Sequence, residues 1–266
     1  MIELRRLTKR YGDVEVVRAL TLSVAKGDLL VLLGGSGSGK TTTLKMINRL
    51  IEPTSGEVRI DGAPTDGLEG HTLRRKIGYV FQKVGLFPHM SVAENVATPL
   101  TLAGWGKDRI DARVAEMLAL VDLEPELAGR SPRELSGGQA QRVGFARALA
   151  AEPKLMLLDE PFGALDPVTR DKLQQSFLAI RRRLELTAIF VTHDMVEALL
   201  IADRIAVMKD GELVQIGTPR QLLESPADEY VERLFEMPRR QAHVVADLMA
   251  GSASASTRAS SGGGPP

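Results

Sequence analysis

A glycine-rich stretch near the start of the chain carries the clearest chemistry in the sequence. It fits the pattern G-x-x-x-x-G-K-[ST], follows an apolar run, and consists of Gly34, Gly35, Ser36, Gly37, Ser38, Gly39, Lys40 and Thr41. Glycines let the backbone curl so that successive N–H groups point at one anion, and a helix start adds its positive dipole end. In this pattern the lysine reaches the β- and γ-phosphates and the hydroxyl ligates Mg²⁺. The stretch therefore predicts a nucleoside triphosphate site.

Two neighbouring carboxylates are the second candidate component. Asp159 and Glu160 directly follow the apolar run Leu155–Leu158. Four consecutive apolar residues suit a strand that is covered on both faces, and two carboxylates at its exit need a cation nearby. We expect Mg²⁺ at Asp159, which leaves Glu160 placed as the general base that polarises an attacking water. An acid-rich surface turn is the alternative interpretation.

A serine followed by two glycines is the third candidate. Ser136, Gly137, Gly138 and Gln139 precede a helical pattern, so Ser136 is a candidate helix N-cap with bare glycine N–H groups beside it. This arrangement predicts a second anion-binding helix start, without a lysine. Taken alone, the same residues are more often a plain junction between a loop and a helix.

The elements that must position these residues alternate between β-rich runs and helical patterns. This alternation favours an α/β fold with a largely parallel central sheet. The candidate strands are Leu29–Leu33, Ile77–Phe81, Leu155–Leu158, Ala188–Thr192 and Ile205–Met208. Asp61-Gly62 and Asp210-Gly211 are typical of hairpin turns, so an antiparallel portion is expected as well.

Helical signals fill the gaps between the candidate strands. Leu44, Ile47 and Ile51 predict an apolar helical face directly after the glycine-rich stretch. Between Phe81 and Leu155 the strand signal disappears, and this block predicts a helical insert. Its signals are a capping box of Ser91 with Glu94 and a helical face of Ile110, Val114, Met117 and Val121. Thr218, followed by Pro219 and Gln221, predicts a late helix start.

Composition agrees with a globular enzyme core. The chain has 266 residues, 44% of them hydrophobic, and its 34 basic and 34 acidic residues give no footprint for nucleic acid. It has no cysteine, which excludes disulfides and zinc thiolates. No apolar run approaches the about 18 residues of a membrane span, and the first residues lack a signal-peptide pattern, so we expect a peripheral subunit at most. Residues 251–266 are rich in Gly, Ser, Ala and Pro and are expected to be disordered.

Together with the other motifs, Leu135–Gln139 resembles the signature sequence of ATP-binding cassette (ABC) ATPases. The resemblance covers about residues 1–240 and leaves residues 241–266 as a C-terminal extension. It implies a P-loop NTPase (RecA-like) core with an antiparallel β subdomain and an α-helical subdomain inserted at about residues 86–152.

The family resemblance also implies a head-to-tail pair of copies. Each ATP would lie between the phosphate loop of one copy and the signature helix of the other. Lys40 and Asp159 would act from one side, and Ser136 and Gly138 would reach the γ-phosphate from the partner. ATP and Mg²⁺ are the cofactors that this arrangement implies.

Further residues match family positions whose roles come from the resemblance alone. Tyr11 matches an aromatic that stacks on adenine, although packing is the more common reason for such a tyrosine. Gln82 matches a glutamine that contacts Mg²⁺ or the lytic water and senses the transport partner. His193 matches a histidine that touches the γ-phosphate and orders the water. The remaining matches are Thr42 in the phosphate loop and Asp166 in the interface segment Ala164–Asp166.

Within the family, the sequence resembles the importer branch for glycine betaine, choline and carnitine. The segments that carry this likeness are Lys45–Arg49, Gly85–His89 and Pro161–Arg170. It implies an ATPase subunit at the cytoplasmic face of the inner membrane, with two permease subunits and, indirectly, an extracytoplasmic solute-binding protein. The run Gly85–Met90 suits either docking of a permease helix or a buried loop anchor.

Two other functions remain open from the sequence. One is the ATPase of a polar amino acid importer, and the other is a soluble cassette ATPase that acts in DNA repair or translation. Many members of the osmoprotectant branch carry C-terminal CBS repeats; the printed sequence ends before such a segment, so we expect no ionic-strength sensing through it. Gly35 stands where many relatives have proline, and Ala140 where glutamine is common.

Overall fold

The computed structural model describes residues 1–163 and 165–240. Ala164 and residues 241–266, which include the segment 251–266 that is expected to be disordered, lie outside the described residues. The strands are β1 (Ile2–Tyr11), β2 (Val14–Val24), β3 (Leu29–Leu33), β4 (Ser55–Ile60), β5 (Ala63–Pro64), β6 (Ile77–Val80), β7 (Leu155–Asp159), β8 (Thr187–Thr192), β9 (Arg204–Lys209) and β10 (Glu212–Gly217). The α-helices are α1 (Lys40–Ile47), α2 (Gly70–Arg74), α3 (Val92–Leu102), α4 (Lys107–Leu120), α5 (Gly137–Ala150), α6 (Pro167–Leu184), α7 (Met195–Ile201) and α8 (Pro219–Glu224).

The central sheet contains all five strands that the sequence predicts. Its order is β10-β9-β3-β8-β7-β6, and every pair is parallel except the hairpin β9–β10. The turn of this hairpin is Asp210-Gly211, and both residues have the positive φ that a tight hairpin turn needs. The expected α/β fold with a largely parallel sheet is therefore confirmed.

A second, antiparallel sheet has the order β2-β1-β4-β5. The predicted turn at Asp61-Gly62 joins β4 to β5, again with positive φ at both positions. The long strands β1 and β2 are not among the candidate strands from the sequence. Their pairing is interrupted by three register shifts, and many of their side chains are exposed, so no regular alternation marks them.

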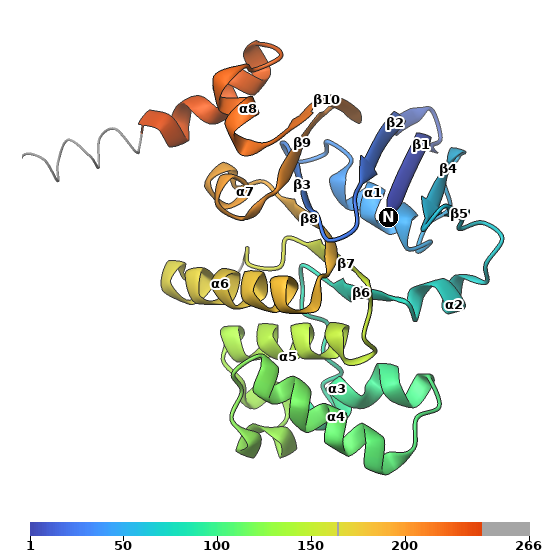
Figure 1. Cartoon of the computed structure of the whole chain (residues 1–266), viewed down its shortest axis with the longest axis vertical. Helices are drawn as coiled ribbons and strands as arrows, with labels where there is room; N and C mark the ends of the chain where they lie inside the picture. The colour runs from blue at the N-terminus through green and yellow to red at the C-terminus, as the bar shows by residue number, and fades with distance from the viewer. Residues whose placement is uncertain (164, 241–266) are drawn as a thin grey trace, which may run out of the picture.

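Two hydrophobic cores lie on opposite faces of the central sheet, and strand β3 contributes to both. Leu29, Val31 and Leu33 pack into the core shared with α5 and α6, whereas Leu30 and Leu32 pack into the core shared with α1 and the antiparallel sheet. The whole strand is buried, which explains its continuous apolar sequence. In Figure 1, α5 and α6 lie on one side of the central strands and the antiparallel sheet lies on the other.

Helix α1 is shorter than its apolar pattern predicts, because it ends at Ile47 and Ile51 lies beyond it. Arg49 takes a left-handed conformation with φ +53°, and the N–H groups of Leu50 and Ile51 both donate to the carbonyl of Lys45. This arrangement satisfies the open carbonyl at the helix end and turns the chain away. Leu44 and Ile47 are buried as predicted, and Ile51 packs against the same core from the following loop.

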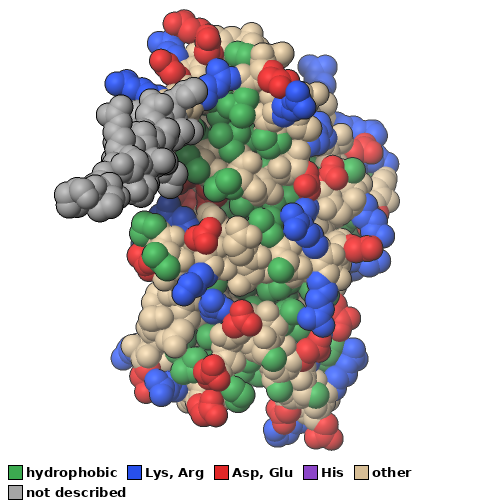
Figure 2. Space-filling view, turned by 60° about the vertical axis from the view of Figure 1, so that its left-hand side comes forward, with side chains coloured by type: hydrophobic (Ala, Val, Ile, Leu, Met, Phe, Trp, Pro, Cys, Tyr) green, Lys and Arg blue, Asp and Glu red, His purple; other side chains and the backbone are tan. Residues whose placement is uncertain are grey.

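The helical insert lies between β6 and β7 and comprises α3, α4, two short 3₁₀ turns and α5. Ser91 with Glu94 caps α3, Ser136 with Gln139 caps α5, and Thr218 with Gln221 caps α8; each pair forms a full capping box. None of the helices in the described part of the chain is both long and apolar enough to cross a membrane. Figure 2 shows acidic and basic side chains interspersed over one face, in keeping with the balanced composition.

Candidate functional site

The glycine-rich stretch forms a loop from the end of β3 to the start of α1, as the sequence predicts. Gly37 and Gly39 have φ of +80° and +94°, a region that side chains with a Cβ rarely adopt. Gly34 is required for a second reason, since a Cβ there would lie 2.1 Å from the carbonyl oxygen of Met208. Sheet and loop are therefore packed too closely for any larger residue at this position.

Lys40 lies inside this loop and its ammonium group contacts the loop backbone. Its Nζ donates to the carbonyls of Gly34 and Gly35, both at 2.8 Å, and to Ser38 Oγ at 3.1 Å. Burial lowers the pKa of Lys40, and the negative charges of Glu160 and Asp159 act against that shift. The loop backbone therefore holds one cationic group at this place.

Thr41 and Asp159 meet beside the loop. The hydroxyl of Thr41 donates to Asp159 Oδ1 at 2.8 Å, although the two residues come from α1 and β7. Burial raises the pKa of Asp159, and the hydrogen bond from Thr41 partly opposes the rise. A hydroxyl and a carboxylate side by side are hard oxygen donors of the kind that Mg²⁺ takes alongside substrate phosphates. The pair therefore fits the predicted metal position.

Glu160 lies between Gln82 and His193. The amide of Gln82 donates to Glu160 Oε2 at 3.0 Å, and His193 Nδ1 lies 3.2 Å from Glu160 Oε1. Each of the three residues follows the end of a strand, β6, β7 or β8, and these strands are neighbours in the parallel sheet. The predicted site residues from three distant parts of the chain are thus brought together at one sheet edge.

Of the signature residues at the start of α5, Ser136 and Gly137 are exposed and Gly138 and Gln139 are partly buried. The hydroxyl of Ser136 accepts from the N–H of Gln139, which makes Ser136 the predicted N-cap. A Cβ on Gly138 would lie 2.7 Å from the side chain of Thr169, so this helix start packs against the beginning of α6. Within the described residues, no hydrogen bond joins positions 136–139 to the phosphate loop.

Two other predicted residues are accessible. Tyr11, at the end of β1, is 51% exposed, and the Lys9 amine lies 5.0 Å from its ring centre. Asp166 caps α6 by accepting from the N–H of Thr169 at 3.0 Å, and this hydrogen bonding lowers the pKa of its carboxyl. The exposed ring of Tyr11 disfavours the packing interpretation of that residue.

Two arginines support the site, and the sequence reasoning missed both. Arg170 donates to the carbonyl of Leu165 at 3.1 Å and to Asp194 at 3.4 Å, and so joins the chain just before α6 to the residue after His193. Arg147 donates to two carbonyls just after Gln82. Each lies on a helix that begins at a motif, but nothing in the local pattern marks its distant backbone partners.

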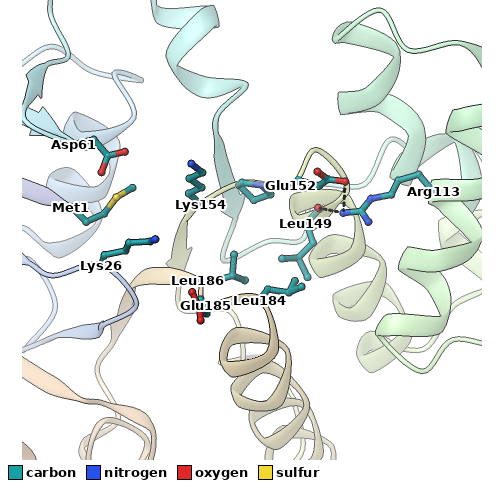
Figure 3. Close-up of a pocket in the computed structure, with 11 residues that line it drawn as sticks. Met1, Lys26, Asp61, Arg113, Leu149, Glu152, Lys154, Leu184, Glu185 and Leu186 are labelled. Carbon is teal, nitrogen blue, oxygen red and sulfur yellow. Dashed lines mark hydrogen bonds and ion pairs between the residues drawn. The ribbon is translucent and has the colours of Figure 1, made fainter.

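A hollow lies at the edge of the central sheet opposite to the candidate residues (Figure 3). It has a volume of about 520 Å³, and its lining includes Lys26, Lys154, Glu185 and Leu186. Lys154 directly precedes β7 and Leu186 directly precedes β8, whereas the candidate residues follow the other ends of these strands. None of the candidate site residues lines this hollow.

The family assignment rests on comparison with known proteins. A family profile described as ABC transporter matches residues 17–163. The chain belongs to this ABC transporter family. Among its relatives, the "Glycine betaine/carnitine/choline transport ATP-binding protein OpuCA" of Bacillus subtilis (strain 168) is 51% identical over 240 residues. This match covers 90% of the chain but 63% of the relative.

Another ABC relative matches over more of its own length. The "Glycine betaine uptake system ATP-binding protein YehX" of Escherichia coli (strain K12) is 51% identical over 235 residues, 88% of this chain and 76% of the relative. A solved structure of the ABC cassette MJ0796, dimeric in a post-hydrolysis state with ADP and Pi, has a TM-score of 0.75 and 36% identity. That match covers 83% of this chain and 99% of the other. The P-loop cassette fold predicted from the sequence is confirmed.

Proposed function

We propose that this chain is the ATP-hydrolysing subunit of an ABC importer. The observation that carries the proposal is the convergence of Gln82, Glu160 and His193 beside the Thr41–Asp159 pair. A charged loop, an oxygen-donor pair and a neighbouring carboxylate to act as general base are the parts that hydrolysis of a phosphoanhydride needs. No covalent intermediate is required.

Each residue has a separate role in the proposed reaction. The loop N–H groups and Lys40 bind the β- and γ-phosphates, while Thr41, Asp159 and Gln82 would hold Mg²⁺. When bound, this ion neutralises charge on the phosphate oxygens. Glu160 accepts a proton from the water that attacks the γ-phosphorus, and ADP leaves as the bond to its β-phosphate oxygen breaks.

His193 and the phosphate loop complete the proposed group around the γ-phosphate. His193 contacts the γ-phosphate and orders the attacking water, while Ser36, Ser38 and Thr42 contribute to phosphate binding. The 3.2 Å distance between His193 Nδ1 and Glu160 Oε1 supports this role, since it brings the imidazole next to the proposed general base. Tyr11 stacks on the adenine, which its exposed ring supports.

The site is completed by a second copy of the chain in head-to-tail orientation. Ser136, Gly137, Gly138 and Gln139 of that copy reach the γ-phosphate, and Asp166 lies at the interface between the copies. The exposed position of Ser136 supports this arrangement, as does the dimeric state named for the similar cassette. A helix start with bare glycine N–H groups suits an anion there.

Two permease subunits are the proposed membrane partners, which places the chain at the cytoplasmic face of the inner membrane. A groove of about 480 Å³ lies beside Gln82, with Phe81, Phe87 and Leu102 among the residues that line it. These three side chains are 40–61% exposed, which is unusual for large apolar groups and supports docking of a partner helix. Leu86 packs into the core and anchors the same loop.

The proposed cargo is a quaternary-ammonium osmoprotectant such as glycine betaine, delivered by an extracytoplasmic solute-binding protein. The names of the relatives support this choice. The test is uptake of labelled glycine betaine by source cells that lack the chain. Wild-type protein should restore uptake, and Glu160→Gln should not. If the cells that lack the chain take up glycine betaine normally but have lost amino acid uptake, the osmoprotectant cargo is excluded. If these cells show neither defect, a soluble cassette ATPase is favoured.

A further inference from the structure

The segment that follows Gln82 is attached to the helical insert rather than to the central sheet. On one side, the buried side chain of Asn95 in α3 accepts from the N–H of Phe87 at 2.8 Å and donates to the Phe87 carbonyl at 3.1 Å. On the other side, Arg147 in α5 donates to the carbonyls of Val84 at 2.8 Å and Gly85 at 2.9 Å. Gln82 itself bonds to Glu160 on the sheet and therefore lies at the joint between the two parts.

Arg147 makes further contacts at this joint. Its guanidinium lies 5.8 Å from the ring centre of Phe87, and its side chain lines the groove beside Gln82. Burial lowers the pKa of Arg147, a desolvation cost that the two carbonyl contacts offset. One turn earlier on α5, Gly144 packs so tightly that a Cβ would lie 2.8 Å from Val84 Cγ1.

The other end of the same helix carries the signature residues. Arg147 lies eleven residues after Ser136, and both belong to the cap and body of α5. A helix of this length is a stiff rod in which eleven residues span about 16 Å. A displacement of the Val84–Phe87 segment is therefore transmitted along α5 to Ser136.

We propose that Arg147 is a positioning residue that fastens the groove-lining segment Val84–Phe87 to α5 and so sets where Ser136 stands relative to Gln82. The proposal rests on the composite ATP site described above. A partner helix in the groove would then act on two points of the site at once, on Gln82 directly and on Ser136 through Arg147.

The test variant is Arg147→Lys, and the matched control is Arg142→Lys. Lysine keeps the charge but lacks the planar fork that bridges two carbonyls. Arg142 lies on the same helix, is also partly buried, and donates to the Val121 carbonyl and to Asp122, away from the groove segment. The two variants therefore differ in the contact that is removed.

The first readout is the distance distribution between spin labels on Lys83→Cys and Arg133→Cys. The chain has no cysteine, so these exposed positions are labelled uniquely. Arg147→Lys should broaden the distribution, and Arg142→Lys should leave it as in the wild type. This measurement needs no hydrolysis, so it tests the fastening even if the proposed ATPase function fails.

The second readout separates kcat from nucleotide affinity. Arg147→Lys should lower the kcat for ATP about 10- to 100-fold, because misplacement of about 1 Å can cost that much. Its Kd for a fluorescent ATP analogue, which depends on the Lys40 loop, should stay within about twofold, as should that of the control. A wild-type label distribution and wild-type kcat in Arg147→Lys would overturn the proposal.

A second pair of variants applies if Arg147→Lys does not fold. Gly144→Ala should displace the segment through its clash with Val84 and lower kcat, and adding Val84→Ala should restore most of the activity by making room. No loss in Gly144→Ala, or no recovery in the double variant, would also overturn the proposal.

Discussion

Glu160 is held from two sides, by the amide of Gln82 and the imidazole of His193. Its own backbone is bent sharply, with φ +44°, and its N–H donates to the carbonyl of Val191 at 3.0 Å. A left-handed glutamate directly after a buried strand is strained for a non-glycine residue. This conformation directs the side chain out of the sheet and toward the joint with Gln82.

Replacement of Glu160 by glutamine should remove the general base and leave the phosphate loop intact. We expect Glu160→Gln to lower ATP turnover about 10²- to 10⁴-fold, the usual contribution of such a group. Binding of ATP with Mg²⁺ should persist, and trapped ATP should hold two copies together in size-exclusion chromatography. Glu126→Gln, at an exposed position, is the control. Near-normal turnover of Glu160→Gln would show that another group activates the water.

Burial of Asp159 makes its charged form costly to the stability of the fold. Burial raises its pKa in the folded chain above the ordinary value of 3.8, so deprotonation favours the unfolded state. This penalty is absent below about pH 3.8, where the carboxyl is protonated in both states. It grows as the pH rises and is complete above the pKa that Asp159 has in the folded chain. Asp159→Asn should therefore raise Tm at pH 7 by about 2–4 °C for each kcal/mol relieved, and the gain should vanish below about pH 4.

The control for this pH dependence is Asp210→Asn, because Asp210 is exposed in a hairpin turn that asparagine also suits. It should leave Tm unchanged at both pH values. Thermal unfolding followed by circular dichroism measures both variants. A lower Tm for Asp159→Asn at pH 7 would mean that the carboxylate stabilises the fold.

At the scale of elements, the phosphate loop begins where the backbone after β3 lies very close to the backbone of β9. Gly34 faces the carbonyl of Met208, whereas a Cβ on Gly35 would meet nothing within 4 Å. Gly34→Ala should destabilise the fold by about 1–3 kcal/mol or more through overpacking. Gly35→Ala should stay within about 0.5 kcal/mol. Urea unfolding midpoints compare the two, and equal midpoints would mean that the loop moves aside freely.

The same packing explains what the sequence can predict. Strands β3, β7 and β8 are buried along their whole length, so each carries a continuous apolar run that stands out. Strands β1 and β2 are exposed in part and pair with register shifts, and their sequences carry no such run. The site motifs were found because each follows a strand end or opens a helix. Arg147 and Arg170 were missed because their partners are carbonyls or acids in other elements.

At the scale of the whole molecule, the candidate site residues fall into two groups. The phosphate loop with Asp159 and Glu160 lies at the end of the central strands, and Ser136 lies at the start of α5 in the helical insert. Among the described residues of one copy, no hydrogen bond joins the Ser136 group to the phosphate loop. The central claim is therefore that each ATP takes Lys40 from one copy and Ser136 from a second.

The most direct test mixes two damaged subunits, Lys40→Ala and Ser136→Arg, both carrying Glu160→Gln so that bound ATP is retained. In the head-to-tail arrangement the mixed dimer has both lesions in one site and an intact second site. Each variant alone should retain almost no ATP after gel filtration, and the mixed dimer should retain one ATP. The mixed dimer contains one wild-type phosphate loop and one wild-type signature, which lie on different copies. If it retained no ATP, each site would be built within a single copy, and the account would be contradicted.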